Sequence, residues 1–367
     1  MNKILVTGSN GFIGKHMTKA LKRNGYEVFE HDLDKTEDEL KTYIKEADFI
    51  VHLAGINRPL SVEEFYDGNS NFTKKLVDFL GIFGKKTPII ISSSTQAALE
   101  NDYGQSKKMA EDYLFASGLP VYVFRLANVF GKWCKPNYNS AAATFMYNIA
   151  HGLPIEIRDP NYVVHYNYVG DIVDTFLECI SGHIGPSKEI LSVSPIYDCS
   201  LGKLASLIKN FKASVESDEH LPNINSIFEY KLFISFLDYL KDDSYSYNFA
   251  EDQRGSFEEL YKNEKYGQIS VNIAFPGITK GGHYHTYKNE IFMTVEGSCI
   301  TRLRKIGTNE IKEYYQEENR SDKVNITPYY THDIKNVGNK NSSTLMWISE
   351  VYSDKTPDTF REDVDIK

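Results

Sequence analysis

The chain has 367 residues, 41% of them hydrophobic and 25% charged, and this length predicts two domains because it exceeds what one hydrophobic core usually organises. The net charge of -9 and the scattered Lys and Arg residues argue against a nucleic acid or an anionic membrane as partner. The four cysteines lie far apart, so we expect neither a disulfide framework nor a thiolate metal site. The apolar runs are strand-sized, too short for a membrane span. We therefore expect a soluble cytoplasmic protein that binds a small molecule.

The first part of the chain has the alternating pattern of segments that is typical of a parallel sheet flanked by helices. Helix-length segments alternate with short apolar runs at 3–7, 26–29, 49–53 and 88–91. We expect residues 1–244 to form a doubly wound (Rossmann) α/β domain.

The pattern of apolar segments changes after about residue 245. Short alternating runs separated by Gly, Pro and Asn turns follow at 270–275, 290–295 and 298–303. This pattern predicts an all-β barrel or sandwich over 245–367, and the polar and aromatic stretch 240–250 is the expected junction.

A glycine-rich turn follows the first apolar run. Gly8, Gly11 and Gly14 stand where a strand ends and a helix begins, which is the context of the dinucleotide fingerprint. Glycine permits close backbone approach, and the helix N-terminus offers N–H groups to a pyrophosphate. Asp32, 18 positions after Gly14, is placed to bind the ribose of NADH and to repel the 2′-phosphate of NADPH, or else is only a loop residue.

Tyr103 and Lys107 stand one helical turn apart and follow a serine-rich strand end, 92–94. We predict that Lys107 lowers the pKa of the Tyr103 phenol, so that Tyr103 transfers a proton near neutrality. The Ser94 hydroxyl is expected to hold the substrate oxygen. These are the candidate catalytic residues.

With the glycine loop, these residues make the first 240 positions similar to the extended short-chain dehydrogenase/reductase family. Segments 48–55, 125–131 and 168–171, together with Asn69, also match. The resemblance implies a nucleotide-sugar substrate and a nicotinamide cofactor, NADPH with NADH as the alternative. It implies a cofactor site made by Gly8, Asn10, Gly11, Phe12, Ile13, Gly14, Asp32, Leu53, Ala54, Gly55 and Lys107.

Three features of the sequence depart from the usual pattern of that family. Only nine positions separate Ser94 from Tyr103, and Val164 and His165 stand where an arginine commonly binds the sugar-nucleotide phosphates. We name Lys132, Lys135 and Arg158 as alternative phosphate ligands, each of which is equally well explained as a solvated side chain. Thr95-Gln96-Ala97 replaces the acidic pair of the sugar dehydratases, which favours simple hydride transfer.

The last third carries Gly277-x5-His283-x-His285-x4-Glu290-x6-Gly297. We expect His283 and His285 on one face of a strand, Glu290 on the next strand, and His332 closing the cage from a later strand. Such ligands suit zinc or another divalent metal, Fe, Ni or Mn, and ligand type alone does not choose among them. The alternative is a barrel whose histidines face a sugar pocket without a metal.

This spacing matches the first signature of the cupin family, and 328–336 resembles the second. Segment 252–259 is similar to a part of the nucleotide-sugar 3,5-epimerases that helps line the sugar pocket. With segments 131–139 and 276–283, the whole chain resembles the bifunctional capsular polysaccharide and O-antigen enzymes, which fuse a reductase to a cupin.

That resemblance implies a zinc-binding homodimer acting on a UDP-sugar in the route to UDP-N-acetyl-L-fucosamine. The cupin would epimerise carbon 3 of a UDP-2-acetamido-2,6-dideoxy-4-ketohexose, and the first domain would then reduce the carbon 4 ketone with NADPH. Epimerisation must come first, because reduction removes the acidity of the neighbouring carbon. Two alternatives are a plain reductase with a non-catalytic, dimerising cupin, and a sugar-nucleotide sensor, against which Tyr103 and Lys107 count.

Overall fold

The structure is a computed structural model that describes residues 2–217, 221–240, 249–263, 265–319, 322–351, 353 and 357–366. The chain divides into two compact units, one of Met1–Lys209 with Asn225–Lys241 and one of Asn210–Ile224 with Asp242–Lys367. Segment Asn210–Ile224, expected in the first domain, thus groups with the second. Most of the junction expected at 240–250 lies outside the described residues.

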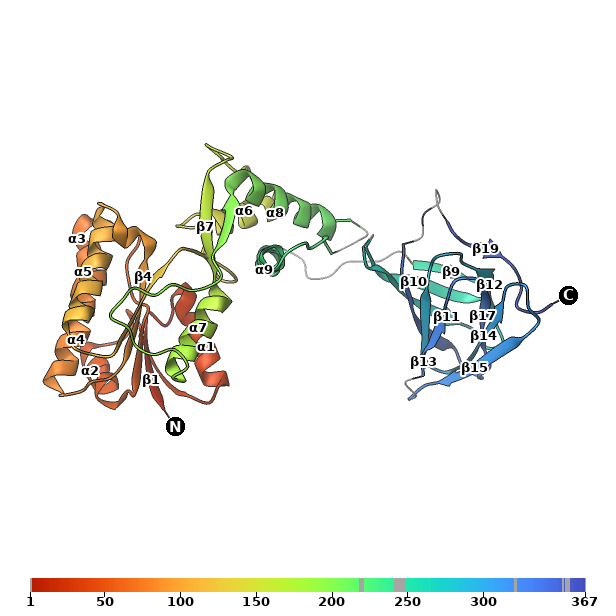
Figure 1. The fold of residues 1–367 in the computed structure, drawn as a ribbon, viewed down its shortest axis with the longest axis horizontal. Helices are drawn as coiled ribbons and strands as arrows, with labels where there is room; N and C mark the ends of the chain where they lie inside the picture. Colours follow the sequence, from red (N-terminus) through yellow and green to blue (C-terminus); the bar gives the residue numbers. More distant parts are fainter. Residues whose placement is uncertain are drawn as a thin grey trace. The chain divides into compact units, whose positions relative to one another are not determined.

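The first unit is built on a five-stranded parallel sheet in the order β2-β1-β3-β4-β5 (Figure 1). Its strands are β1 (Lys3–Thr7), β2 (Glu27–His31), β3 (Phe49–His52), β4 (Ile89–Ser94) and β5 (Val121–Leu126). The first four lie at the predicted runs with shifts of a few residues at their ends. Because β2 and β3 flank β1, the carboxyl ends of β1 and β3 border the point where the strand order reverses, where open α/β sheets bind ligands.

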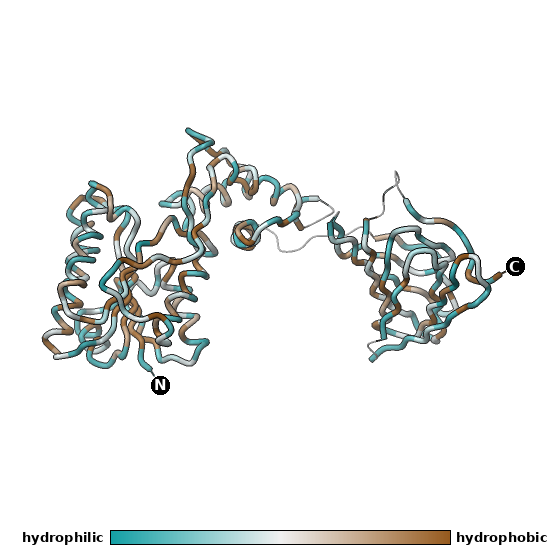
Figure 2. Tube along the Cα trace, viewed as in Figure 1, coloured by the Kyte–Doolittle hydropathy of each residue, from teal (hydrophilic) through white to brown (hydrophobic). Residues whose placement is uncertain are grey.

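Helices cover both faces of this sheet, and the alternation within β1 shows why. Ile4 and Val6 enter one core with α1 and α7, whereas Leu5 enters the other core with α2, α4 and α5 (Figure 1). Strands buried on both faces read as continuous apolar runs, and Figure 2 shows the central strands as hydrophobic. These helices are α1 (Phe12–Arg23), α2 (Glu37–Glu46), α4 (Phe72–Ile82), α5 (Asp102–Ala116) and α7 (Val169–Ile180). The doubly wound prediction is confirmed.

The rest of the first unit departs from a simple α/β repeat. A small sheet, β6-β7-β8, stands apart from the main one, which the sequence pattern did not indicate. Its strands are β6 (Asn128–Phe130), β7 (Val163–Tyr168) and β8 (Tyr197–Ser200), and the remaining helical elements are α3 (Val62–Phe65), the π-helical turn η1 (Tyr66–Asn71), the 3₁₀ turn η2 (Thr95–Ala98), α6 (Ala141–Ala150), α8 (Leu201–Val215), α9 (Ile227–Phe236) and the 3₁₀ turn η3 (Leu237–Tyr239). Among the described residues, no helix combines the length and apolarity needed to cross a membrane.

The described residues from Phe249 onward form two sheets, which confirms the all-β prediction for this part of the chain. The six-stranded sheet has the order β16-β13-β18-β11-β10-β9, and the five-stranded sheet has the order β15-β14-β17-β12-β19. Their bounds are β9 (Phe249–Asp252), β10 (Gly255–Asn263), β11 (Gly267–Ala274), β12 (Thr279–Tyr284), β13 (Glu290–Glu296), β14 (Ser298–Lys305), β15 (Ile311–Glu317), β16 (Val324–Ile326), β17 (Tyr330–Asn336), β18 (Ser342–Ile348) and β19 (Phe360–Arg361). On β11 the buried, alternating positions Gln268, Ser270 and Asn272 are polar, so this part of the interior is not a purely apolar core.

Candidate functional site

The glycine loop joins the ends of β1 and β3 to the start of α1. Gly8 has φ +68°, and a Cβ there would lie 2.6 Å from the Ala54 nitrogen. A Cβ on Gly14 would lie 2.0 Å from the Gly8 oxygen, so neither position accepts a side chain without movement. Gly11 caps α1 without a side chain that could bind the first N–H groups. This backbone surface, bordered by Leu53, Ala54 and Gly55, fits a dinucleotide pyrophosphate.

Asp32 braces the same loop. Its carboxylate accepts hydrogen bonds from the backbone nitrogens of Asn10 (2.7 Å) and Leu33 (2.8 Å). Phe12 and Ile13, in the first turn of α1, are half-buried, and Ile13 packs against the core below. Asp32 is therefore part of the loop architecture, and its role toward a ribose stays a prediction.

The short interval between Ser94 and Tyr103 is closed by the turn η2. A Cβ on Gly104 would lie 2.2 Å from the Gln96 oxygen, so the absence of a side chain lets α5 begin directly against η2. Asn101 caps that helix by accepting the Gly104 N–H at 2.8 Å. The Ser94 and Tyr103 side chains consequently lie close enough for Ser94 to influence the Tyr103 phenol.

Burial raises the pKa of Tyr103, and the nearby Ser94 hydroxyl acts in the opposite direction. The prediction that Lys107 lowers this pKa is wrong for the described structure, because desolvation dominates and Lys107 is not among the causes. The reason is tertiary packing, which the helical spacing of the two residues does not reveal.

Lys107 is buried beside the cofactor loop. Its Nζ donates to the Ser92 oxygen at 3.3 Å, and a Cβ on Gly55 would lie 2.8 Å from that Nζ and 2.7 Å from Asn69 Oδ1. Burial lowers the pKa of Lys107 to about 8, while Glu111 acts to raise it. The structure thus brings Lys107, Ser94 and Tyr103 to the edge of the sheet that also carries the glycine loop.

Sequence reasoning missed Glu111 as part of this site. Glu111 is wholly buried and binds Arg125 of β5 and Ser93 of β4. A glutamate four positions after Lys107, on the same helical face, was the available signal.

The basic residues considered for phosphate binding have other contacts. Lys132 Nζ lies 2.9 Å from Asp238, Lys135 Nζ lies 5.2 Å from the centre of the Tyr138 ring, and Arg158 is highly exposed beside Glu156. None of these contacts gathers the three residues into one site, so their phosphate role stays a prediction.

The second unit brings the four predicted metal ligands together. One potential ligand atom from each of His283, His285, Glu290 and His332 lies within 4.8 Å of the other three. His283 is on β12, Glu290 opens β13 and His332 is on β17. His285 lies just beyond the end of β12, after a register shift between Gly281 and His283. The expectation that both histidines project from one face holds for their side chains, which converge on the same site, although the strand ends one residue before His285.

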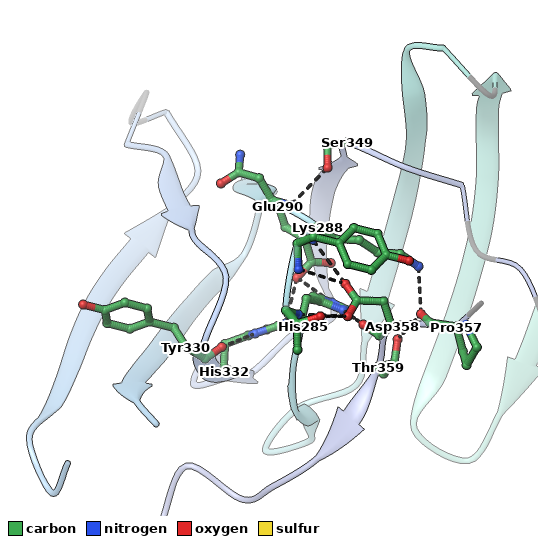
Figure 3. A network of polar contacts seen from close by, with 12 residues as sticks. His285, Lys288, Glu290, Tyr330, His332, Ser349, Pro357, Asp358 and Thr359 are labelled. Atoms are coloured by element: carbon green, nitrogen blue, oxygen red, sulfur yellow. Dashed lines mark hydrogen bonds and ion pairs between the residues drawn. The ribbon is translucent and has the colours of Figure 1, made fainter. Parts of the chain in front are cut away.

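Three of the four candidate ligands, His285, Glu290 and His332, each present a buried atom that has no hydrogen-bond partner among the described residues. His332 Nε2 lies 2.8 Å and His285 Nε2 3.4 Å from Glu290 Oε2, yet all three atoms are buried without a hydrogen bond to any described residue. The Nδ1 atoms of His285 and His332 face the backbone oxygens of Asp358 and Tyr330 (Figure 3). Because a carbonyl only accepts, each Nδ1 carries the proton and each Nε2 presents its lone pair to the cage.

The electrostatics of the cage favour a cation. Burial acts to raise the pKa of Glu290, but in the absence of a metal a proton on the facing His285 or His332 outweighs it and holds the pKa well below its ordinary value. Burial, with help from His332, lowers the pKa of His283 to about 4. Burial also acts to lower the pKa of His285, but the Glu290 carboxylate produces a net increase. A buried carboxylate among imidazole nitrogens fits a divalent metal such as zinc.

The cage opens into a cavity of about 540 Å³. Its wall includes polar and charged side chains of β10, β11 and β12, among them Glu259, Gln268, Asn272 and Lys280. A cavity of this size with several polar groups accommodates a sugar-sized ligand.

Comparison with known proteins identifies the two units. Residues 4–193 match the NAD dependent epimerase/dehydratase family, and residues 250–360 match the polysaccharide biosynthesis C-terminal domain. The chain is 39% identical over 365 residues to a Pseudomonas aeruginosa protein named UDP-2-acetamido-2,6-beta-L-arabino-hexul-4-ose reductase, and the match covers 98% of each. The chain belongs to the NAD dependent epimerase/dehydratase family.

Within that family, the chain belongs with CapF and its relatives. The crystal structure of the capsular polysaccharide assembling protein CapF from Staphylococcus aureus is 38% identical, with a TM-score of 0.87 over 99% of this chain and 100% of that chain. A UDP-glucose 4-epimerase from Thermotoga maritima, 21% identical, matches 65% of this chain with a TM-score of 0.54, covers 98% of its own length, and shows the fold alone.

Proposed function

We propose that this chain is a bifunctional enzyme acting on a UDP-2-acetamido-2,6-dideoxy-4-ketohexose. The second unit inverts carbon 3, and the first unit then reduces the carbon 4 ketone in the route to UDP-N-acetyl-L-fucosamine. The observation that carries the proposal is the presence of two separate chemical centres, the Ser94–Tyr103 pair beside a dinucleotide loop and the His283–His285–Glu290–His332 cage. The P. aeruginosa relative, a reductase by name, supports the substrate class.

In the reduction, the nicotinamide supplies a hydride to carbon 4 when it is bound. Ser94 holds the ketone oxygen and Tyr103 donates a proton to it, which leaves an alcohol. Lys107 places a buried positive charge next to Gly55 and Asn69, on the cofactor side of this pair. We propose NADPH as the cofactor on the strength of the family resemblance. The engagement of Asp32 by two backbone N–H groups supports a structural role for this residue, and comparing kcat/KM for NADPH and NADH tests the assignment.

In the epimerisation, the ketone acidifies the proton on carbon 3. A divalent metal, zinc in this proposal, supplies Lewis acidity toward the ketone when it is bound. His283, His285, Glu290 and His332 hold it, while the surrounding cavity orients the sugar. This step precedes reduction, because an alcohol at carbon 4 no longer acidifies its neighbour.

The proposal is tested by incubating the enzyme with the UDP-4-ketosugar in D2O without NADPH and following carbon 3 by NMR. We expect deuterium at carbon 3 with the parent protein and none with His283→Ala. If the parent consumes NADPH but catalyses no exchange, the chain is a reductase carrying a non-catalytic cupin. A homodimer and a cytoplasmic location are further parts of the proposal, and light scattering on the purified protein tests the first of them.

A further inference from the structure

The described residues 357–366, here called the strap, run along the metal cage. Within the strap, β19 pairs with β12, so that Arg361 lies opposite His283. The backbone nitrogen of Glu362 donates to the Gly282 oxygen at 3.1 Å, and the Glu362 oxygen accepts from the Thr331 hydroxyl next to His332. The strap therefore contacts both strands that carry cage histidines.

Asp358 contacts a cage ligand directly, and it binds the segment that follows this ligand through its side chain (Figure 3). Its backbone oxygen accepts from His285 Nδ1 at 2.5 Å. Its carboxylate accepts from the Thr286 nitrogen (2.9 Å) and hydroxyl (2.5 Å), and from the nitrogens of Tyr287 and Lys288, both at 3.2 Å. One residue thus fixes an imidazole ring and the three amides that follow it.

The segment that Asp358 holds has no sheet partner of its own. His285 begins it, Glu290 follows it as the first residue of β13, and residues 285–289 belong to neither strand. Two of the four cage ligands are thus joined by an irregular turn whose amides are satisfied largely by one carboxylate. Asp358 is only 6% exposed, a costly position for a charge that its four donors offset.

The backbone of Asp358 is also specialised, since its φ of +40° lies in the left-handed region that aspartate and asparagine tolerate better than most residues. In this conformation the Asp358 carbonyl accepts a hydrogen bond from His285, while its carboxylate accepts hydrogen bonds from residues 286–288. Asp358→Asn consequently keeps the shape and the backbone tolerance, but it removes the charge and replaces one acceptor oxygen with an NH2 donor.

We propose that Asp358 is a positioning residue of the metal cage, which fixes the His285 tautomer and the spacing between His285 and Glu290 before the cation binds. The inference deepens the metal-binding part of the proposed function and rests on it. Groups that orient metal ligands through hydrogen bonds are worth about 10–100-fold in metal affinity.

The test is metal affinity measured on the full-length protein, stripped of metal and titrated with Zn²⁺ against a chromophoric chelator. Asp358→Asn is expected to weaken Zn²⁺ binding by about 10–100-fold and to change the visible spectrum of the Co²⁺-loaded protein. Asp365→Asn is the matched control, because Asp365 lies in the same strap and pairs with Arg302 at 2.8 Å on the exposed side. The control is expected to bind Zn²⁺ like the parent.

Each outcome decides a different point. Equal Zn²⁺ affinities of the parent and a folded Asp358→Asn protein overturn the inference while leaving the cage intact. A parent that binds no stoichiometric Zn²⁺ or Co²⁺ refutes the cage and the inference together, whereas a metal-loaded parent without carbon 3 exchange refutes only the proposed epimerase. If Asp358→Asn does not fold, Thr286→Val removes one donor to the carboxylate and is expected to weaken binding in the same direction; unchanged affinity overturns the inference.

Discussion

Glu111 and Arg125 form a two-pronged ion pair in the first unit, with Arg125 Nε 2.9 Å from Glu111 Oε1 and Nη2 2.7 Å from Oε2. Glu111 also accepts from the Ser93 hydroxyl at 2.6 Å. The pair therefore ties α5, which carries Tyr103 and Lys107, to the strands β4 and β5. It links the two elements whose side chains meet in the proposed reductase centre.

We expect Glu111→Gln to lower the free energy of unfolding of the first unit by about 3 kcal/mol, because it leaves the Arg125 charge without its carboxylate. Guanidinium denaturation followed by far-UV circular dichroism measures this loss. Lys108→Ala, which removes an exposed pair with Asp112 on the same helix, is the control and should leave the unfolding curve unchanged. Equal curves for the two variants would show that the buried pair contributes nothing.

Tyr103→Phe removes the hydroxyl that meets Ser94 but keeps the ring. We expect kcat for ketone reduction to fall by about 10²–10⁴-fold, since the proton donor is lost, while NADPH binding and carbon 3 exchange persist. Stopped-flow oxidation of NADPH and fluorescence titration separate the two effects. Tyr113→Phe, on the same helix, is expected to retain parental turnover, and a similar loss there would point to helix damage rather than proton transfer.

The local part of this architecture was predictable from sequence. The strand, the glycines and the helix around Gly8 follow one another directly, so their spacing alone indicates β1, the loop and α1. The convergence of His283, His285, Glu290 and His332 was also anticipated, because the spacing of the two cupin signatures is tied to the turns of a barrel.

Contacts between distant segments were not predictable in the same way. Asp358 binds His285 across 73 positions, and no periodicity relates an aspartate to a histidine so far away. The direction of the Tyr103 pKa depends on burial by packed neighbours such as Phe65, whose ring centre lies 5.6 Å away. The sheet β6-β7-β8 escaped prediction because β7, with the sequence VVHYNY, mixes apolar and polar residues without a clear alternation and is partly exposed.

His52 is expected to make the first unit sensitive to acid. Burial lowers its pKa to about 3, and its ring nitrogens contact the hydroxyls of Thr7 (2.7 Å) and Thr73 (2.9 Å). His52 takes up a proton near pH 6.5 in the unfolded chain, whereas it stays neutral at that pH in the folded chain. The contribution of this neutral histidine to stability is thus fully present above pH 6.5 and decreases as pH falls toward 3, by about 1.4 kcal/mol per pH unit.

Denaturation of the parent and of His52→Gln between pH 7 and 4 checks this expectation. We expect the variant to be less stable at pH 7, and its stability to depend less steeply on pH, because the titrating group is gone. His183→Gln changes an exposed histidine and should keep the parental slope. Parallel slopes for the parent and His52→Gln would assign the acid sensitivity to other groups.

Metal removal is expected to destabilise the second unit selectively. Without a cation, the buried Glu290 carboxylate and the Nε2 atoms of His285 and His332 lose the partner that their geometry implies. At a free metal concentration near 1,000 times Kd, binding contributes about 4 kcal/mol to stability, so a chelator should lower the Tm of the barrel by several degrees. Calorimetry on the full-length protein with and without chelator measures the shift, and carbon 3 exchange should be lost in the same samples.

Reduction of a ketosugar already epimerised at carbon 3 should continue, because Ser94, Tyr103 and Lys107 belong to the other unit. His283→Ala should show little further response to the chelator, and a shift as large as the parent's would mean that the chelator acts away from the cage.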